Sequence, residues 1–178
     1  DLFVDNLKTT LGIHKRKDRI DLTRDLMLCK MYNYASRTLS ILPPELYLRK
    51  ENFQGLGIGN TKPPCIYVGE DMMRGRTDRE LAFILGKTLS YFRAEHYLAR
   101  IKPREELKTI FVALLRFIFP DVQVELSEES RMLISHMEKS LKPEAIHALP
   151  NLAEPYRGGA NLSTWVQNIE YTSNRCGL

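Results

Sequence analysis

Apolar residues recur at helical spacing between residues 77 and 98, in the segment TDRELAFILGKTLSYFRAEHYL. Thr77 precedes the first turn and Glu80 follows three residues later, which is the spacing of a reciprocal capping box. The pattern predicts a helix from Thr77 to Leu98 with one buried face. The apolar positions of that face are Leu81, Ile84, Leu85 and Phe92.

Similar spacing predicts further helices on both sides of this segment. Prolines and cap residues set their expected ends. The expected helices are Asp21 to Ser40, Pro103 to Pro120, one capped by Ser127, a short one from Pro143, and a last one from Asn161 or Ser163. The residues from 150 to 160 are expected to form a loop because they contain prolines and glycines.

Between residues 45 and 69 the signals change to those of short strands. Leucines alternate with other residues at 45–49, glycines alternate with Leu56 and Ile58 at 56–59, and an apolar run occupies 66–68. We therefore predict an α+β fold in which a small sheet of short strands packs on several helices.

The amino-acid composition excludes only a few of the possible functions. The 178 residues are 43% hydrophobic and 27% charged, with a net charge of +4. Basic and acidic residues are interleaved, which makes nucleic acid an unlikely partner. The longest apolar run contains Arg116, so no membrane span is expected. Three widely spaced cysteines favour a reducing compartment.

The run FILGKTLSYF carries the first resemblance to a known family. It resembles the active-site helix of the gluzincin zinc peptidases of the HtpX and CAAX-prenyl-protease type, in which a small residue precedes H-E-x-x-H. Lys87 and Tyr91 stand at the two histidine positions, and Thr88 stands at the position of the catalytic glutamate. An ammonium, a phenol and a hydroxyl cannot replace two imidazole ligands and a general base near pH 7.

The C-terminal run NIEYTSNRCGL carries the second resemblance. In the family, a glutamate on a later helix is the third zinc ligand, and a small residue and an aspartate follow it. Glu170 stands at the ligand position, and Ser173 and Asn174 stand at the other two. The resemblance therefore implies that the carboxylate ligand remains while both imidazoles are replaced.

The resemblance covers roughly residues 39 to 178 and implies a zincin-like, minigluzincin-like fold with a vestigial active-site helix. It suggests a division into an N-terminal helical arm at 1–42 and a metallopeptidase-like domain at 43–178, a piece of a longer protein. If the helices pack as in the family, Lys87 comes near Glu170 and its ammonium occupies the space of the metal. The edge strand with Leu56, Gly57 and Ile58 then forms a groove for an extended peptide.

The resemblance thus implies a catalytically inactive pseudopeptidase domain with no catalytic residue, metal or cofactor. We expect it to bind a protein partner or peptide segment as a scaffolding module, in the cytoplasm of a bacterium. A flanking segment of tetratricopeptide or other helical repeats would be typical of this group. The alternative is an active peptidase or amidase with a displaced metal site, built on Glu170, Asn174 and a histidine brought near by folding.

Overall fold

The computed structural model describes residues 4–50, 52–157 and 160–178, and these form two compact units. Unit 1 comprises the described residues up to Ile101 together with Ile169–Leu178, and unit 2 comprises those within Lys102–Asn168. As predicted, the fold is α+β. The division expected between residues 42 and 43 stays a prediction, and residues 1–3 of that expected arm lie outside the described residues.

Unit 1 is built around a three-stranded sheet of β1 (Glu45–Leu48), β2 (Leu56–Gly59) and β3 (Cys65–Val68), which confirms the predicted strands. The order is β1-β3-β2, with β1 parallel and β2 antiparallel to the central β3. The outer edge of β1 is covered, because the amide of Ile20 donates to Leu46 O at 2.8 Å and that of Leu48 donates to Asp18 O at 2.7 Å. The strand at the opposite edge is β2.

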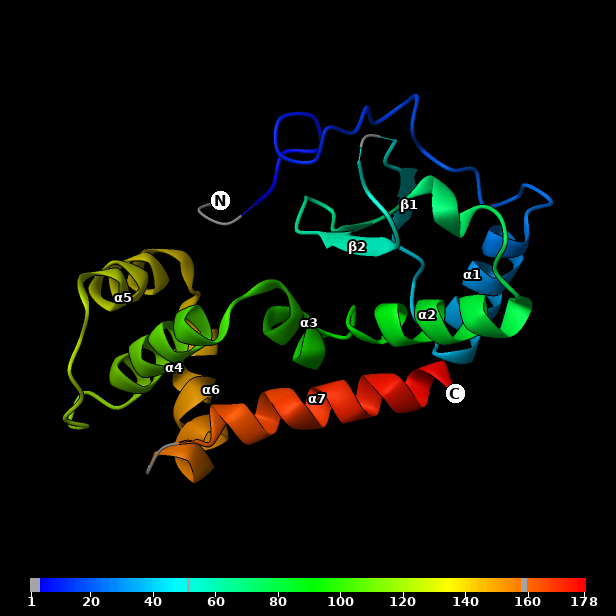
Figure 1. Ribbon diagram of the computed structural model, residues 1–178. Coiled ribbons are helices and arrows are strands. Elements are labelled where there is room, and N and C mark those ends of the chain that lie inside the picture. Colours follow the sequence, from blue (N-terminus) through cyan, green and yellow to red (C-terminus); the bar gives the residue numbers. More distant parts are fainter. Residues whose placement is uncertain (1–3, 51, 158–159) are drawn as a thin grey trace. The chain divides into compact units, whose positions relative to one another are not determined.

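Helices α1 (Met27–Thr38) and α2 (Asp78–Ser90) pack against each other beside the sheet (Figure 1). Their facing side chains join those of β1 and β3 in one apolar core. The most deeply buried members of this core are Leu28, Cys29, Tyr32, Leu46, Ile66, Val68, Met72, Leu85 and Leu89. A short 3-10 helix, η1 (Glu70–Met72), connects β3 to the segment before α2.

Helix α1 begins six residues later than predicted. The Oδ1 atom of Asp21 accepts hydrogen bonds from both the amide (2.9 Å) and the hydroxyl (2.8 Å) of Thr23. This local turn offers the backbone an alternative to the first helical turn. The helical spacing of apolar residues after Asp21 therefore overstates the length of the helix.

The helix predicted from Thr77 to Leu98 is in fact two helices, α2 and α3 (Ala94–Ile101). The predicted capping box of Thr77 and Glu80 is present at the start of α2. At the other end, the Ser90 hydroxyl donates to Lys87 O at 2.7 Å, and Nδ1 of His96 lies 3.0 Å from Ser90 O. These side chains satisfy carbonyls at the helix terminus, which allows α2 to end at Ser90.

The C-terminal part of α7 (Leu162–Gly177) crosses α2 at very short range (Figure 1). A Cβ atom added at Gly86 would overlap the carbonyl oxygen of Cys176 and lie 3.2 Å from the Cα of Gly177. A Cβ atom at Gly177 would lie 2.6 Å from Phe83 O. Only glycines permit this approach, so Gly86 and Gly177 set the distance between the two helices.

Unit 2 contains α4 (Arg104–Ile118), α5 (Glu128–Ser140), α6 (Pro143–Ala153) and the 3-10 helix η2 (Glu154–Tyr156). The cap predicted at Ser127 is present. Of the two expected starts of the last helix, Asn161 and Ser163, the side chain of Asn161 accepts from the amide of Thr164 in the first turn. The loop predicted at 150–160 is wrong in its first part, because α6 continues through Pro150, whose ring is compatible with helical φ. Residues 158 and 159 of that loop lie outside the described residues.

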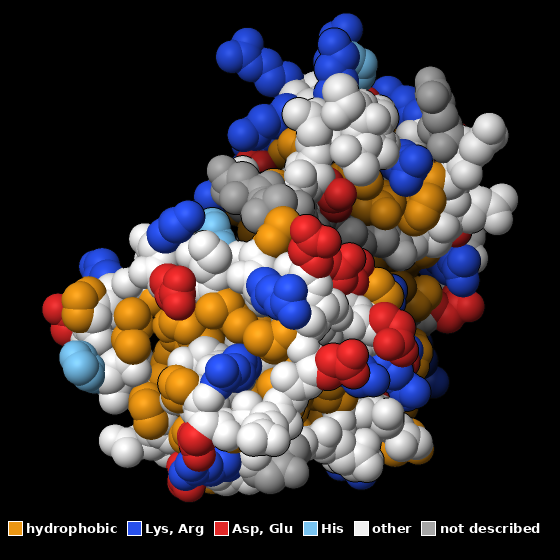
Figure 2. Space-filling model, turned by 90° about the vertical axis from the view of Figure 1, so that its left-hand side faces the viewer, with side chains coloured by type: hydrophobic (Ala, Val, Ile, Leu, Met, Phe, Trp, Pro, Cys, Tyr) orange, Lys and Arg blue, Asp and Glu red, His pale blue; other side chains and the backbone are white. Residues whose placement is uncertain are grey.

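Large apolar side chains remain exposed in unit 2, among them Met132, Leu152 and Tyr156. The face shown in Figure 2 carries patches of hydrophobic side chains, with acidic and basic groups interspersed among them. Among the helices that the structure describes, none is both long and apolar enough to cross a membrane.

We predict that Gly86→Ala lowers the free energy of unfolding by about 2 kcal/mol, because overlap with the backbone of α7 outweighs the higher helix propensity of alanine. Urea denaturation followed by circular dichroism measures the change. Arg79→Ala, at an exposed position of the same helix, is the control and should change stability by less than about 0.5 kcal/mol. An equally stable Gly86→Ala variant would contradict the close helix crossing.

Candidate ligand-binding site at the crossing of α2 and α7

Lys87 and Glu170 meet where the two helices cross. The Nζ atom of Lys87 lies 2.5 Å from Oε1 of Glu170, which confirms the contact expected between these residues. The side chains keep 31% and 48% of their exposed area, respectively, so the pair is accessible to solvent. An ion pair of this kind joins the two helices where they already approach and contributes only modestly to stability.

Tyr91, one helical turn after Lys87, completes the arrangement. Its hydroxyl donates a hydrogen bond to Oε2 of Glu170. Burial and the neighbouring carboxylate raise the pKa of Tyr91 to about 12, so the phenol keeps its proton at neutral pH. Each oxygen of Glu170 therefore has its own donor.

These two donors change the acidity of Glu170. The hydrogen bond from Lys87, followed by that from Tyr91, lowers the pKa of the Glu170 carboxyl below its usual value. Hydrogen bonds and a nearby positive charge favour the ionised form. Glu170 is therefore a carboxylate at neutral pH, and both its oxygens are engaged within the protein.

A small cavity of about 120 Å³ lies beside this cluster. Four elements contribute its walls: β2, α2, α3 and α7. The lining residues are Leu56, Ile58, Lys87, Thr88, Tyr91, Arg100 and Glu170. The structure thus brings together six of the eight residues expected at the vestigial site or the peptide groove, with Arg100 in addition.

Gly57 and Asn174 are the two expected residues that do not line the cavity. Gly57 faces the opposite side of the sheet, where a Cβ atom would lie 2.6 Å from the hydroxyl oxygen of Tyr67. Side chains alternate along a strand, so Leu56 and Ile58 point to the cavity side while Gly57 makes room for the tyrosine ring. Ser173, at the small-residue position of the family pattern, is fully buried.

Arg100 is the cavity residue that the sequence did not indicate. Its guanidinium carbon lies 5.3 Å from the centroid of the Tyr91 ring, within the range of a cation–π contact. The residue belongs to α3, which was expected to continue α2 without a break. A break predicted after Ser90 would have indicated that α3 changes direction and can bring Arg100 to the cavity.

The residues at the crossing do not fit the zinc ion that active members of the resembled family bind. Lys87 places a positive charge against the carboxylate, and both Glu170 oxygens already accept hydrogen bonds. In the described part of the chain, no cluster of three or more His, Cys, Asp or Glu side chains is arranged to hold a metal. A divalent cation would have to displace the ammonium and the phenol proton to reach the carboxylate.

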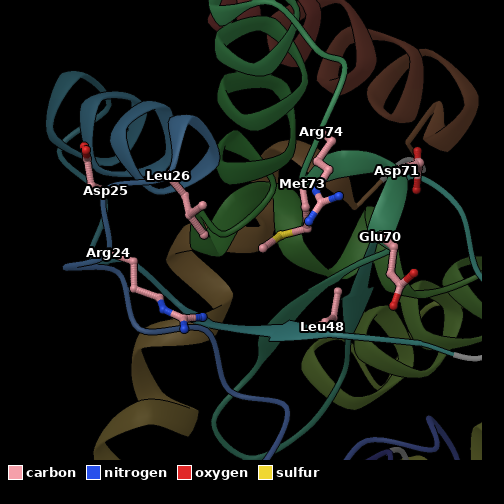
Figure 3. A pocket seen from close by; sticks show the side chains of 8 residues that line it. All are labelled: Arg24, Asp25, Leu26, Leu48, Glu70, Asp71, Met73 and Arg74. Carbon is pink, nitrogen blue, oxygen red and sulfur yellow. The ribbon is translucent and has the colours of Figure 1, made fainter.

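A larger open cavity of about 920 Å³ lies elsewhere in unit 1. Figure 3 shows Arg24 and Arg74 on either side of an apolar floor that includes Leu48 and Met73, with Asp71 pointing away. The outer edge of the nearby strand β1 is already paired with the chain segment around Ile20. This edge of β1 is therefore not open to an added strand.

No protein-family model, curated protein or solved structure matches the chain. The gluzincin resemblance therefore stays a prediction that rests on the two short motifs.

We predict that Glu170→Gln lowers the free energy of unfolding at pH 7 by about 1 kcal/mol. The expected change is this small because solvent screens the partly exposed ion pair. A carboxyl with a lowered pKa stabilises the fold above its ordinary value of 4.5, and this stabilisation is lost as pH falls through the lower folded-state pKa. The difference between wild type and variant should therefore shrink as the pH falls below 4.5. Urea titrations at several pH values measure it.

Glu95→Gln is the control for this experiment. Glu95 forms only a long, exposed ion pair of 3.8 Å with Arg93, so its replacement should change stability little at any pH. A Glu170→Gln effect that is independent of pH would show that the charge of Glu170 does not contribute.

We also predict that the double substitution Lys87→His and Tyr91→His creates a zinc site with Glu170, because the side chains at both positions already converge on its carboxylate. The variant should bind about one zinc ion per chain in calorimetry and elemental analysis. Lys87→His alone is the control and should bind zinc much more weakly. A folded double variant that takes up no zinc would contradict the gluzincin-like arrangement of the two helices.

Proposed function

We propose that this chain is a catalytically inactive, metallopeptidase-like module that binds an extended peptide segment of a protein partner along β2. The observation that carries the proposal is the position of β2, at an edge of the sheet and beside the Lys87, Tyr91 and Glu170 cluster. The resemblance suggests that the module belongs to a bacterial, cytoplasmic protein and that tetratricopeptide repeats neighbour it.

The hydrogen-bond register of β2 supports this use of the edge. The amide of Gly69 donates to Gly55 O at 2.9 Å, and Gly57 lies opposite Tyr67 on β3. In an antiparallel pair, alternate residues direct their N–H and C=O groups toward and away from the partner. The backbone groups of Leu56 and Ile58 therefore point away from β3, where an added strand can pair with them.

The charge arrangement supports binding rather than hydrolysis. Zinc peptidases need a metal-activated water and a general base. At the corresponding positions this chain has an ammonium, a phenol that stays protonated and a threonine. The side chains of Lys87 and Tyr91 instead neutralise and immobilise Glu170.

The alternative of a hydrolase with a displaced metal site requires a histidine near Glu170 and Asn174. Among the described residues that line the cavity there is no histidine, and Asn174 is not part of its lining. His96 is close in sequence to the cavity-lining Arg100, but its Nδ1 atom lies 3.0 Å from Ser90 O. These observations favour the inactive module over the enzyme.

We predict that the immobilised chain retains members of a degenerate pool of nine-residue peptides blocked at both ends. Ile58→Pro should reduce retention about tenfold, because proline removes an edge-facing donor and hinders pairing. Ile58→Val, which keeps the amide, is the control and should retain the pool. Mass spectrometry of the eluted peptides provides the measurement.

Two outcomes would contradict the proposal. If the folded wild-type chain retains no peptide, β2 is not a binding edge. If protein purified without chelator cleaves the pool and carries stoichiometric metal, the hydrolase alternative is correct. Circular dichroism of Ile58→Pro and Ile58→Val establishes that the two variants are folded equally well.

A further inference from the structure

Among the described residues, Arg100 forms no direct ion pair, and its charge acts on the carboxylate of Glu170 only from a longer distance. Lys87 is paired with Glu170 at 2.5 Å, and the other oxygen of Glu170 accepts from Tyr91. Arg100 contacts the Tyr91 ring instead of an acidic side chain. The cavity therefore has two positive groups and one negative group, and its surplus charge belongs to Arg100.

The contact with Tyr91 leaves the hydrogen-bonding groups of Arg100 available. A cation–π contact uses the charge of the guanidinium, whereas its N–H donors form hydrogen bonds with oxygen acceptors. Tyr91 thus contacts Arg100 without occupying these donors. A planar guanidinium held in this way is suited to two parallel hydrogen bonds with a carboxylate.

The size of the cavity suits one short side chain. Its volume of about 120 Å³ corresponds to about four water molecules at about 30 Å³ each. This is close to the volume needed by the few non-hydrogen atoms of an acidic side chain. Leu56 and Ile58 form an apolar wall beside the charged groups.

The geometry of strand addition directs a ligand side chain to this place. A strand paired with β2 continues the pleat of the sheet, so every second side chain lies on the same face as Leu56 and Ile58. That face carries the cavity. One residue of the added strand therefore has its side chain directed toward Arg100.

We infer that the peptide bound along β2 carries an aspartate or glutamate side chain within its extended segment, and that Arg100 binds its carboxylate. The inference rests on the proposed function, and it adds the chemical class of the ligand. Repulsion from Glu170 is limited because Lys87 and Tyr91 each bond one of its oxygens. Arg100 is thus the residue that determines specificity.

The test uses peptide pools blocked at both ends that differ only at the central position, which is Asp, Glu, Asn or Gln. Immobilised wild-type chain should retain the two acidic pools about tenfold more strongly than the two amide pools. Arg100→Gln should abolish this difference between the acidic and the amide pools. Arg93→Gln removes a nearby arginine that does not line the cavity and should preserve the preference.

The outcomes separate this inference from the proposed function. Equal retention of acidic and amide pools by the wild type would overturn the inference while leaving peptide binding in place, whereas no retention of any pool would overturn both. An acidic preference that survives Arg100→Gln would exclude Arg100 as its source. A further pool with free C-termini tests whether the bound carboxylate is the peptide's C-terminus. Retention of that pool alone, whatever the residue at its central position, would overturn the assignment to an internal side chain.

Discussion

The close crossing of α2 and α7 is the constraint on which the candidate site depends. Gly86 and Gly177 lack the atoms that would separate the helices, so the backbones approach until they touch. Lys87 follows Gly86 directly, and Glu170 lies about two helical turns before Gly177. The glycines thus determine whether the charged side chains can meet at all, and the ion pair is a consequence of the packing rather than its cause.

The cluster around Glu170 also shows how side chains of one helix can fix a carboxylate on another. A carboxylate that points into a helix crossing needs compensation, whether by a cation or by hydrogen bonds. In this chain an ammonium and a phenol supply that compensation from one face of α2. Because these groups belong to the protein, the arrangement does not depend on a supply of ions, and Glu170 is held in one orientation.

The sequence allowed the strands, the capping box and the Lys87–Glu170 contact to be predicted, because each depends on local patterns or on a motif that fixes two positions. The boundaries of α1, α2 and α6 could not be predicted as well. They depend on single side-chain bonds, such as those of Asp21 and His96, which compete with the apolar spacing. Arg100 was missed for the same reason, since its place in the cavity follows from the break after Ser90 and not from any motif.

The segment around Ile20 that pairs with β1 has an effect on how this protein can associate. A sheet with two open edges can add strands at both, and successive copies then extend into fibres. Covering β1 removes one of those edges, so β2 is the edge that the described sheet leaves for strand addition. Two copies paired through β2 would then have no second open edge of this sheet from which a fibre could grow.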